Sequence, residues 1–239
     1  MNRGIAADVL EVLKAGPPLR RSEDPERIEA AAVRHRVSWQ RVLWAILDLS
    51  ALLELRAELA NSRRSISDDI RAHGLASAPN ELLAELSARV DQTRAVLRAF
   101  IFEGKVLLDL LSKAVVDTLG AARGFGEKHD NLATRLDRYA DTLGVARPPA
   151  AIVERARDLE ERLANVRDYI LVHPKMENTQ GYARAYVHPH GSNLQIGTLF
   201  PDDEEEEART IDIDELASGL EVYARDLMLW VASVVSAAS

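Results

Sequence analysis

Two long stretches of this chain repeat apolar residues at the spacing of an α-helix, and this pattern constrains the fold more than any other feature of the sequence. The first runs from about residue 25 to 60, and the second from about residue 80 to 119. Along the second stretch the apolar positions are Leu82, Leu83, Leu86, Val90, Leu97, Ile101, Leu108, Leu111 and Val115. Helices of this length bury an apolar face against one another, so the pattern predicts an all-α helical bundle.

The first long helix has a clear start signal. The segment Ser22-Glu23-Asp24-Pro25 supplies capping residues and a proline suited to the first helical turn. The polar pair Asn61 and Ser62 predicts a break, followed by a shorter helix that ends near His73. We expect the apolar face of the long helix to run through Val33, Val37, Leu43, Trp44, Leu47 and Leu55. Core packing is the preferred interpretation of all three tryptophans, Trp39, Trp44 and Trp230.

Shorter helices are expected at residues 5–14, 127–143, 150–172 and 212–236, with Gly144 and Pro174 ending two of them. Between residues 182 and 200 the pattern changes to two segments of strand propensity around a turn. We therefore predict a small β-hairpin before the last helix. No fixed-period repeat or composition shift marks a boundary, so one domain, residues 1–239, is expected. Within it, residues 1–75 are an N-terminal helical extension and residues 80–238 are the core.

Composition excludes several classes of function. The chain has no cysteine, which excludes disulfides, thiolate metal sites and a cysteine nucleophile. The longest apolar run, residues 227–235, is far shorter than the ~20 residues of a membrane span, and the amino terminus does not resemble a signal peptide. We expect a cytoplasmic protein that does not enter a membrane. No nucleotide-binding or metalloprotease motif is present, so no cofactor and no metal are expected.

The net charge of −8 argues against broad binding of nucleic acid, and no DNA partner is expected. Six of the negative charges lie in one run at residues 202–207, so the rest of the chain could still form a local basic pocket. That run could bind a basic partner or cover a basic groove, as an antitoxin-like segment would. A solvated loop is the commoner structure for such a run.

One segment, Arg167-Asp168-Tyr169-Ile170-Leu171-Val172-His173-Pro174, carries the main functional hypothesis. It resembles the Arg-x(4–6)-His motif of the HEPN superfamily of helical bundles, and the wider resemblance covers roughly residues 80–238. The same spacing recurs at Arg123–His129 and at Arg184–His190. Only the pair Arg167–His173 ends a strongly periodic helix and has a polar residue after the arginine, so its context distinguishes it from the other two pairs.

The resemblance implies a metal-independent endoribonuclease of the toxin or defence type, acting on RNA as a homodimer with one composite cleft on the two-fold axis. His173 would take the proton from a ribose 2′-hydroxyl, and Arg167 would stabilise the charge on the attacked phosphate. Asp168 could orient the ring or the arginine, and Tyr169 could stack on a base. The preceding helix would lose its geometry before Pro174, which frees the imidazole.

Three other interpretations stay open for this segment and this fold. Arg167 could form a structural ion pair while His173 stabilises a helix carboxyl end. The protein could be a non-catalytic helical module that binds a protein partner, or an unrelated bundle in which the motif is accidental.

Other candidate residues have structural explanations. His188 and His190 could share a strand face as zinc ligands, but the glycine and proline beside them favour a solvated turn. Glu103 and Asp109 are six residues apart on an apolar helix, which places them on different faces. A structural ion pair or surface exposure is expected for each of these two.

Overall fold

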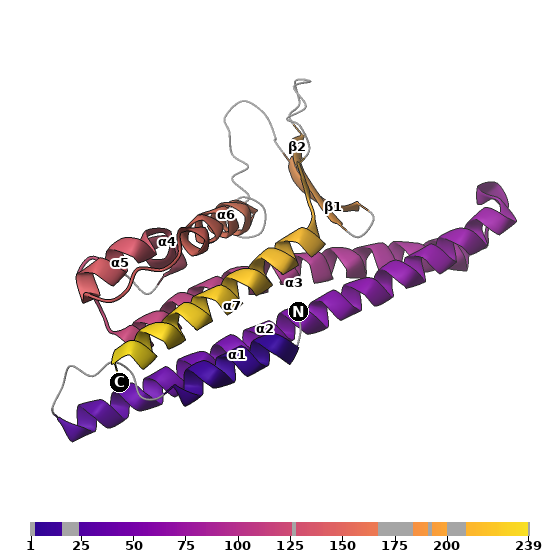
Figure 1. The fold of residues 1–239 in the computed structure, drawn as a ribbon. Coiled ribbons are helices and arrows are strands. Elements are labelled where there is room, and N and C mark those ends of the chain that lie inside the picture. Colours follow the sequence, from indigo (N-terminus) through magenta and orange to yellow (C-terminus); the bar gives the residue numbers. More distant parts are fainter. Residues whose placement is uncertain are drawn as a thin grey trace. The chain divides into compact units, whose positions relative to one another are not determined.

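A computed structural model of the chain describes residues 3–15, 24–125, 128–166, 184–190, 193–199 and 209–238 (Figure 1). Its α-helices are α1 (Arg3–Lys14), α2 (Pro25–His73), α3 (Asn80–Leu119), α4 (His129–Leu132), α5 (Leu136–Leu143), α6 (Ala150–Val166) and α7 (Ile213–Ala238). Short 3-10 turns occur at η1 (Leu75–Ser77) and η2 (Ala133–Arg135). The predicted all-α helical bundle is confirmed.

Helix α2 begins as the sequence predicts and ends later than expected. Asp24 accepts a hydrogen bond from the backbone N–H of Glu26 at 3.1 Å, and Pro25 is the first helical residue. The predicted break at Asn61 and Ser62 is wrong, because α2 continues to His73. Neither residue is a glycine or proline, and buried apolar residues continue at helical spacing on both sides of the pair, at Leu59, Ile66 and Ile70.

The helix predicted at residues 127–143 is divided into α4, η2 and α5. Gly144 ends α5, as predicted, with a φ of 68° that suits glycine. The next helix, α6, is described to Val166, so the last part of the predicted 150–172 helix lies outside the described residues. Helix α7 is capped by Asp212, whose Oδ1 accepts hydrogen bonds from the N–H groups of Asp214 and Glu215.

The described part of the chain before α7 includes three short strands. They are β1 (Arg184–His190), β2 (Asn193–Leu199) and β3 (Arg209–Ile211). β1 pairs antiparallel with β2, with Arg184 opposite Leu199, and β2 pairs antiparallel with β3. The strand order is therefore β1-β2-β3.

The chain divides into two compact units, each assembled from separate segments. The first unit comprises residues 1–48, 103–165 and 216–239. Its core is made of aliphatic residues with a few aromatic ones, contributed by α2, α3, α6 and α7: Trp39, Val42, Ile46, Leu107, Leu108, Leu111, Val115, Leu159, Leu163, Leu220, Tyr223 and Leu227. A Cβ added at Gly104 of α3 would lie 3.3 Å from Leu220 and 3.4 Å from Leu163, so three helices approach closely there.

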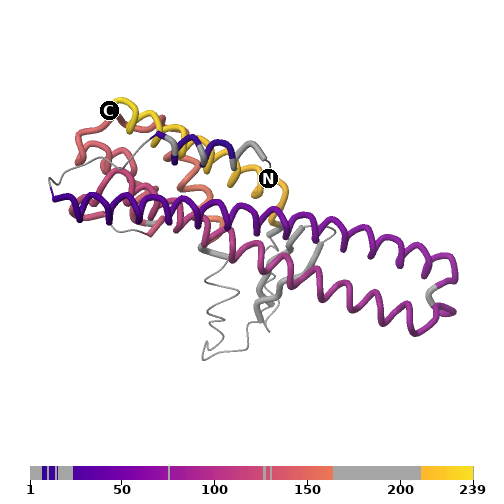
Figure 2. The backbone as a smooth tube through the Cα atoms, turned by 90° about the horizontal axis from the view of Figure 1, so that it is seen from below, coloured from indigo at the N-terminus to yellow at the C-terminus, as the bar shows by residue number. Residues whose placement is uncertain are grey.

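The second unit comprises residues 49–102 and 166–215. Within it, the end of α2 and the start of α3 run antiparallel, joined through η1 (Figure 2). Their facing sides bury Leu59, Ile66, Ile70, Val96, Leu97 and Phe100. Arg56, almost fully buried, forms a 2.7 Å ion pair with the exposed carboxylate of Asp214.

Each of the described helices is too short or too polar to cross a bilayer.

Candidate functional site

The residues predicted to form a ribonuclease site, Arg167, Asp168, Tyr169 and His173, lie outside the described residues, as does the acidic run at 202–207. The structure describes the helix that precedes this segment, α6, up to Val166. His188 and His190 lie in β1, of which only the backbone is described. The candidate sites among the described residues are therefore formed by other side chains.

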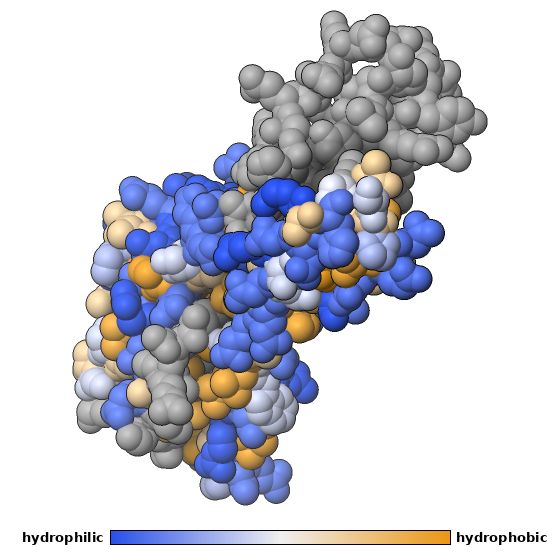
Figure 3. All heavy atoms as spheres, turned by 90° about the vertical axis from the view of Figure 1, so that its right-hand side faces the viewer, coloured by the Kyte–Doolittle hydropathy of each residue, from blue (hydrophilic) through white to orange (hydrophobic). Residues whose placement is uncertain are grey.

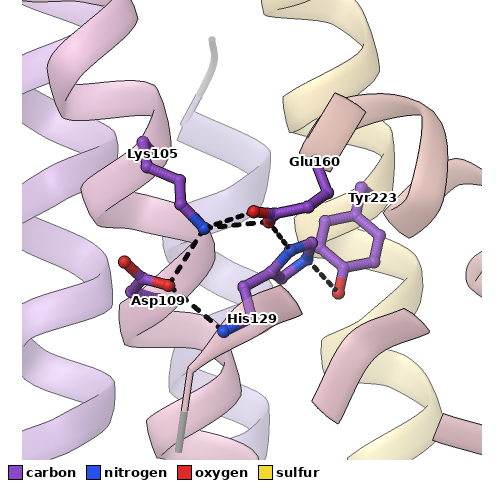
Figure 4. Close-up of polar contacts among 5 residues, drawn as sticks. All are labelled: Lys105, Asp109, His129, Glu160 and Tyr223. Atoms are coloured by element: carbon purple, nitrogen blue, oxygen red, sulfur yellow. Dashed lines mark hydrogen bonds and ion pairs between the residues drawn. The ribbon is translucent and has the colours of Figure 1, made fainter. Parts of the chain in front are cut away.

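A buried polar cluster joins four helices of the first unit (Figure 4). The Lys105 ammonium of α3 contacts both carboxylate oxygens of Glu160 in α6, at 2.7 and 2.9 Å, and Asp109 at 3.2 Å. Glu160 also contacts the Nδ1 of His129 in α4, and the Nε2 of this ring lies 3.0 Å from the hydroxyl of Tyr223 in α7. Asp109 accepts the backbone N–H of His129 at 3.1 Å. We call these five residues the buried network.

The protonation states of the buried network follow from burial and hydrogen bonding. Burial is the largest effect on His129 and lowers its pKa, so the ring is neutral, although Glu160 opposes this shift. Burial alone would raise the pKa of Glu160, but hydrogen bonds from His129 and Lys105 outweigh it and lower this pKa to about 2. Burial raises the pKa of Tyr223. The consistent arrangement has Nδ1–H of His129 donating to Glu160, while Nε2 accepts from Tyr223.

The buried network supports the fold and is poorly placed for catalysis. The side chain of His129 and the whole of Tyr223 are 0 % exposed, and Lys105 is only 6 % exposed. A substrate would have to enter the packed helices to reach the ring or the phenol. Each charged or ring group already has a partner of suitable chemistry, which is how buried ionic groups are accommodated. Among the described residues, no group of three acidic or histidine side chains is arranged to hold a metal.

Part of this cluster is predictable from the sequence. Asp109 forms a structural ion pair, which was one of the two outcomes expected for it. Lys105 lies four residues before Asp109 in a mostly apolar part of α3, and this spacing places the two side chains on one face. His129 appeared only in a chance repeat of the Arg-x5-His spacing, and nothing in the local pattern connects it with Glu160, 31 residues later.

A second polar cluster decides which side of α2 is buried in the first unit. The hydroxyl of Thr118 in α3 contacts the indole Nε1 of Trp39 at 2.9 Å and the Nδ1 of His35 at 2.8 Å. It also donates to the backbone oxygen of Ala114 at 2.7 Å. Beside it, the hydroxyl of Ser38 donates to the carboxylate of Asp117. These contacts turn Trp39 and its neighbours toward α3.

The opposite side of α2 is apolar and exposed. Val33, Val37, Trp44 and Leu47 are 52 %, 41 %, 55 % and 53 % exposed. With Gln40 they fall within an arc of about 80° on the helix. We call these five residues the outer face of α2. Apolar side chains also reach the surface among hydrophilic ones in the view of Figure 3.

The structure corrects the prediction of which face of α2 is buried. Trp39 and Trp230 are core residues as predicted, but the expectation that Trp44 packs in the core is wrong. The face predicted to be buried, including Val33, Val37 and Leu47, is the exposed one. The reason is that α2 carries apolar residues on two opposite sides, and only the side of Trp39 has polar atoms matched by α3.

Comparisons of the chain with models of known families, with curated proteins and with solved structures find no match in any of the three. The geometry alone therefore ranks the candidates. The polar groups of the buried network have partners within the fold, whereas the apolar side chains of the outer face of α2 are exposed to solvent.

Proposed function

We propose that this protein is a non-catalytic helical interaction module and that it binds a protein surface through the outer face of α2. One observation carries the proposal: four large apolar side chains on one helix face are each at least two-fifths exposed. Isolated apolar residues are common on protein surfaces, but a row of them on one face is typical of an interaction site. A central tryptophan is also a common anchor of protein interfaces.

The energetic reason is the hydrophobic effect. Fully burying a side chain of this size contributes roughly 1.5–3 kcal/mol, and these residues realise only about half of that in the single chain. The buried network bears on this function only through the fold, because it joins α3, which contacts α2, to α4, α6 and α7.

In-cell photo-crosslinking tests the proposal. A photoreactive residue replaces Val37 in one version and Leu229 of α7, an equally apolar residue that is 50 % exposed, in the other. We expect one defined adduct from position 37 and none from position 229. The adduct must be identified by mass spectrometry, re-formed from purified components and lost on adding Leu47→Glu. Equal crosslinking from both positions, or no adduct from position 37, would overturn the proposal.

The sequence that follows α6 favours a second candidate, a metal-independent endoribonuclease of the cytoplasm. Its support is the Arg-x5-His segment, which begins at Arg167 directly after the last described residue of α6. Its site would contain Arg167 and His173 from two subunits of a homodimer, assisted by Asp168 and Tyr169, with RNA as substrate and an antitoxin-like protein as partner.

Incubation of the purified protein with structured and single-stranded RNA in EDTA tests this second candidate. Cleavage that leaves 2′,3′-cyclic phosphate ends, and that both Arg167→Ala and His173→Ala abolish, is the expected result. The matched control is Arg123→Ala, because this arginine has the same spacing to a histidine. Intact RNA after incubation with a folded protein would exclude the activity.

A further inference from the structure

We propose that the partner of the outer face of α2 is a second copy of this chain, whose α2 packs antiparallel to the first about a two-fold axis near Trp44. This inference rests on the proposed function and names its partner. It depends on the charges beside the outer face as well as on the apolar residues within it.

Two opposite charges flank the outer face on the same side. Arg41 and Asp48 are seven residues apart, so they lie about 20° from each other around the helix. Both are exposed, and neither forms an ion pair with another residue of the described part of the chain. They lie three residues before and four residues after Trp44, nearly symmetric about it.

An antiparallel pair related by a two-fold axis brings each flank against the same flank of the other copy. With the axis near Trp44, Arg41 of each copy faces Asp48 of the other copy. The contact therefore occurs twice. The two Trp44 side chains meet at the axis, where an aromatic pair is favourable. A parallel pair would turn this flank away from its copy, so Arg41 and Asp48 could not meet.

A second carboxylate supports the assignment of charge. Glu103 of α3 lies beside Asp48, and its pKa is raised, first by burial and then by the charge of Asp48. Two carboxylates thus share this end of the outer face without a cation among the described residues. A guanidinium from the other copy would neutralise them, and such a charge-assisted contact is favourable at a partly desolvated interface.

A charge exchange tests the pairing. Arg41→Asp sets two acids against each other, and Asp48→Arg sets two arginines against each other. We expect each single variant to raise the dimer dissociation constant by about ten-fold or more, measured by sedimentation equilibrium. A mixture of the two variants restores both contacts, so it should form a heterodimer of wild-type affinity. The double variant Arg41→Asp, Asp48→Arg should also dimerise like wild type, which shows that folding is intact.

An apolar control separates the outer face from exposed apolar residues in general. Leu47→Glu should raise the dissociation constant about 100-fold, because each copy loses a buried leucine. Leu229→Glu, on α7, removes an equally exposed leucine and should leave the dissociation constant unchanged.

Single cysteines determine the orientation, since the natural chain has none. At a protein concentration high enough to offset the loss of the indole, Trp44→Cys should form a covalent dimer with a short bismaleimide, because the two positions meet at the axis. Val33→Cys should not, because in the antiparallel pair its two copies lie about 33 Å apart along the helices. Linkage through position 33 would indicate a parallel pair and overturn the inference.

The failures of the two proposals are distinguishable. A purified protein that stays monomeric, together with a defined adduct to a different protein from position 37 in cells, overturns the second copy and leaves the interaction module in place. A dimer that is unaffected by Leu47→Glu and by both charge variants also overturns the inference. If position 37 gives no adduct and the purified protein forms no dimer, both proposals are overturned.

Discussion

Trp39 donates its indole N–H to the hydroxyl oxygen of Thr118 at 2.9 Å, and this contact distinguishes the buried side of α2 from the exposed one. Trp44 follows five residues later and lies about 140° further around the helix, where it is 55 % exposed. Both tryptophans are on apolar sides of the same helix. The polar atoms of α3 therefore select between two sides that hydrophobicity alone does not distinguish.

Replacing Thr118 with valine should strongly destabilise the protein. The substitution keeps the shape of the side chain but leaves the indole N–H of Trp39 and the ring of His35 without their acceptor. We expect the free energy of unfolding to fall by about 2–4 kcal/mol in urea titrations. Thr142→Val is the matched control, because the Thr142 hydroxyl also bonds a backbone oxygen four residues earlier but is exposed. A similar loss in both variants would contradict this explanation.

Removing Lys105 alone should destabilise the protein more than removing Lys105 together with its charge partner Glu160. Lys105→Met leaves Glu160 charged inside the core, and we expect a loss of about 3–5 kcal/mol. The double variant Lys105→Met, Glu160→Leu should recover part of this loss. Arg162→Met breaks an exposed ion pair with Asp158 and should change stability by less than about 1 kcal/mol. Additive losses in the double variant would show that the two groups are not coupled.

Acid should destabilise the protein in two stages. The pKa of His129 is below 6.5 in the folded chain, so the unfolded chain takes up this proton first and the free energy of unfolding falls as the pH drops below about 6.5. The pKa of Glu160 falls from 4.5 to about 2 on folding, so its contribution is lost between these two values.

Urea titrations over a series of pH values measure both stages. His129→Gln should flatten the first stage, and part of the slope should remain because burial also lowers the pKa of His35. Glu160→Gln should flatten the second stage. Glu161→Gln, the same substitution at the next residue, is the control and should leave this stage in place. An unchanged slope in His129→Gln would contradict the assignment of a neutral, buried ring.

Two helical glycines should respond differently to alanine. At Gly219 of α7 an added Cβ makes an ordinary contact with Leu159 at 3.4 Å, so Gly219→Ala should raise the melting temperature through its higher helix propensity, worth about 1 kcal/mol. At Gly104 the Cβ would be crowded by Leu220 and Leu163, both fully buried. Gly104→Ala should therefore bring no gain, and Gly104→Val a clear loss. Equal gains at both sites would show that the three helices can separate.

Periodicity and capping predict the helices of this protein well. The start of α2 at Pro25 and the end of α5 at Gly144 follow from residues with strong local preferences. The predicted break at Asn61 and Ser62 fails because polar residues are compatible with a helix whose buried side continues past them. Local sequence thus identifies where helices begin and end more reliably than where they continue.

The partners of polar residues are not predictable in the same way. The ring of His129 is matched by Glu160 and Tyr223, which are 31 and 94 residues away, and only the packing of α4, α6 and α7 brings them together. The prediction from spacing interchanges the buried and exposed sides of α2 for the same reason. Spacing identifies two apolar sides, but the hydroxyl that selects one of them belongs to another helix.

The distance in sequence between Trp39 and Thr118 also has a consequence for biosynthesis. The two residues are 79 positions apart, so the acceptor is made well after α2 is complete. At the usual rate of 5–20 residues per second, this interval is roughly 4–16 s. During this time both apolar sides of the nascent α2 lack their partners. The growing chain therefore exposes apolar residues on two sides of α2 until the end of α3 emerges.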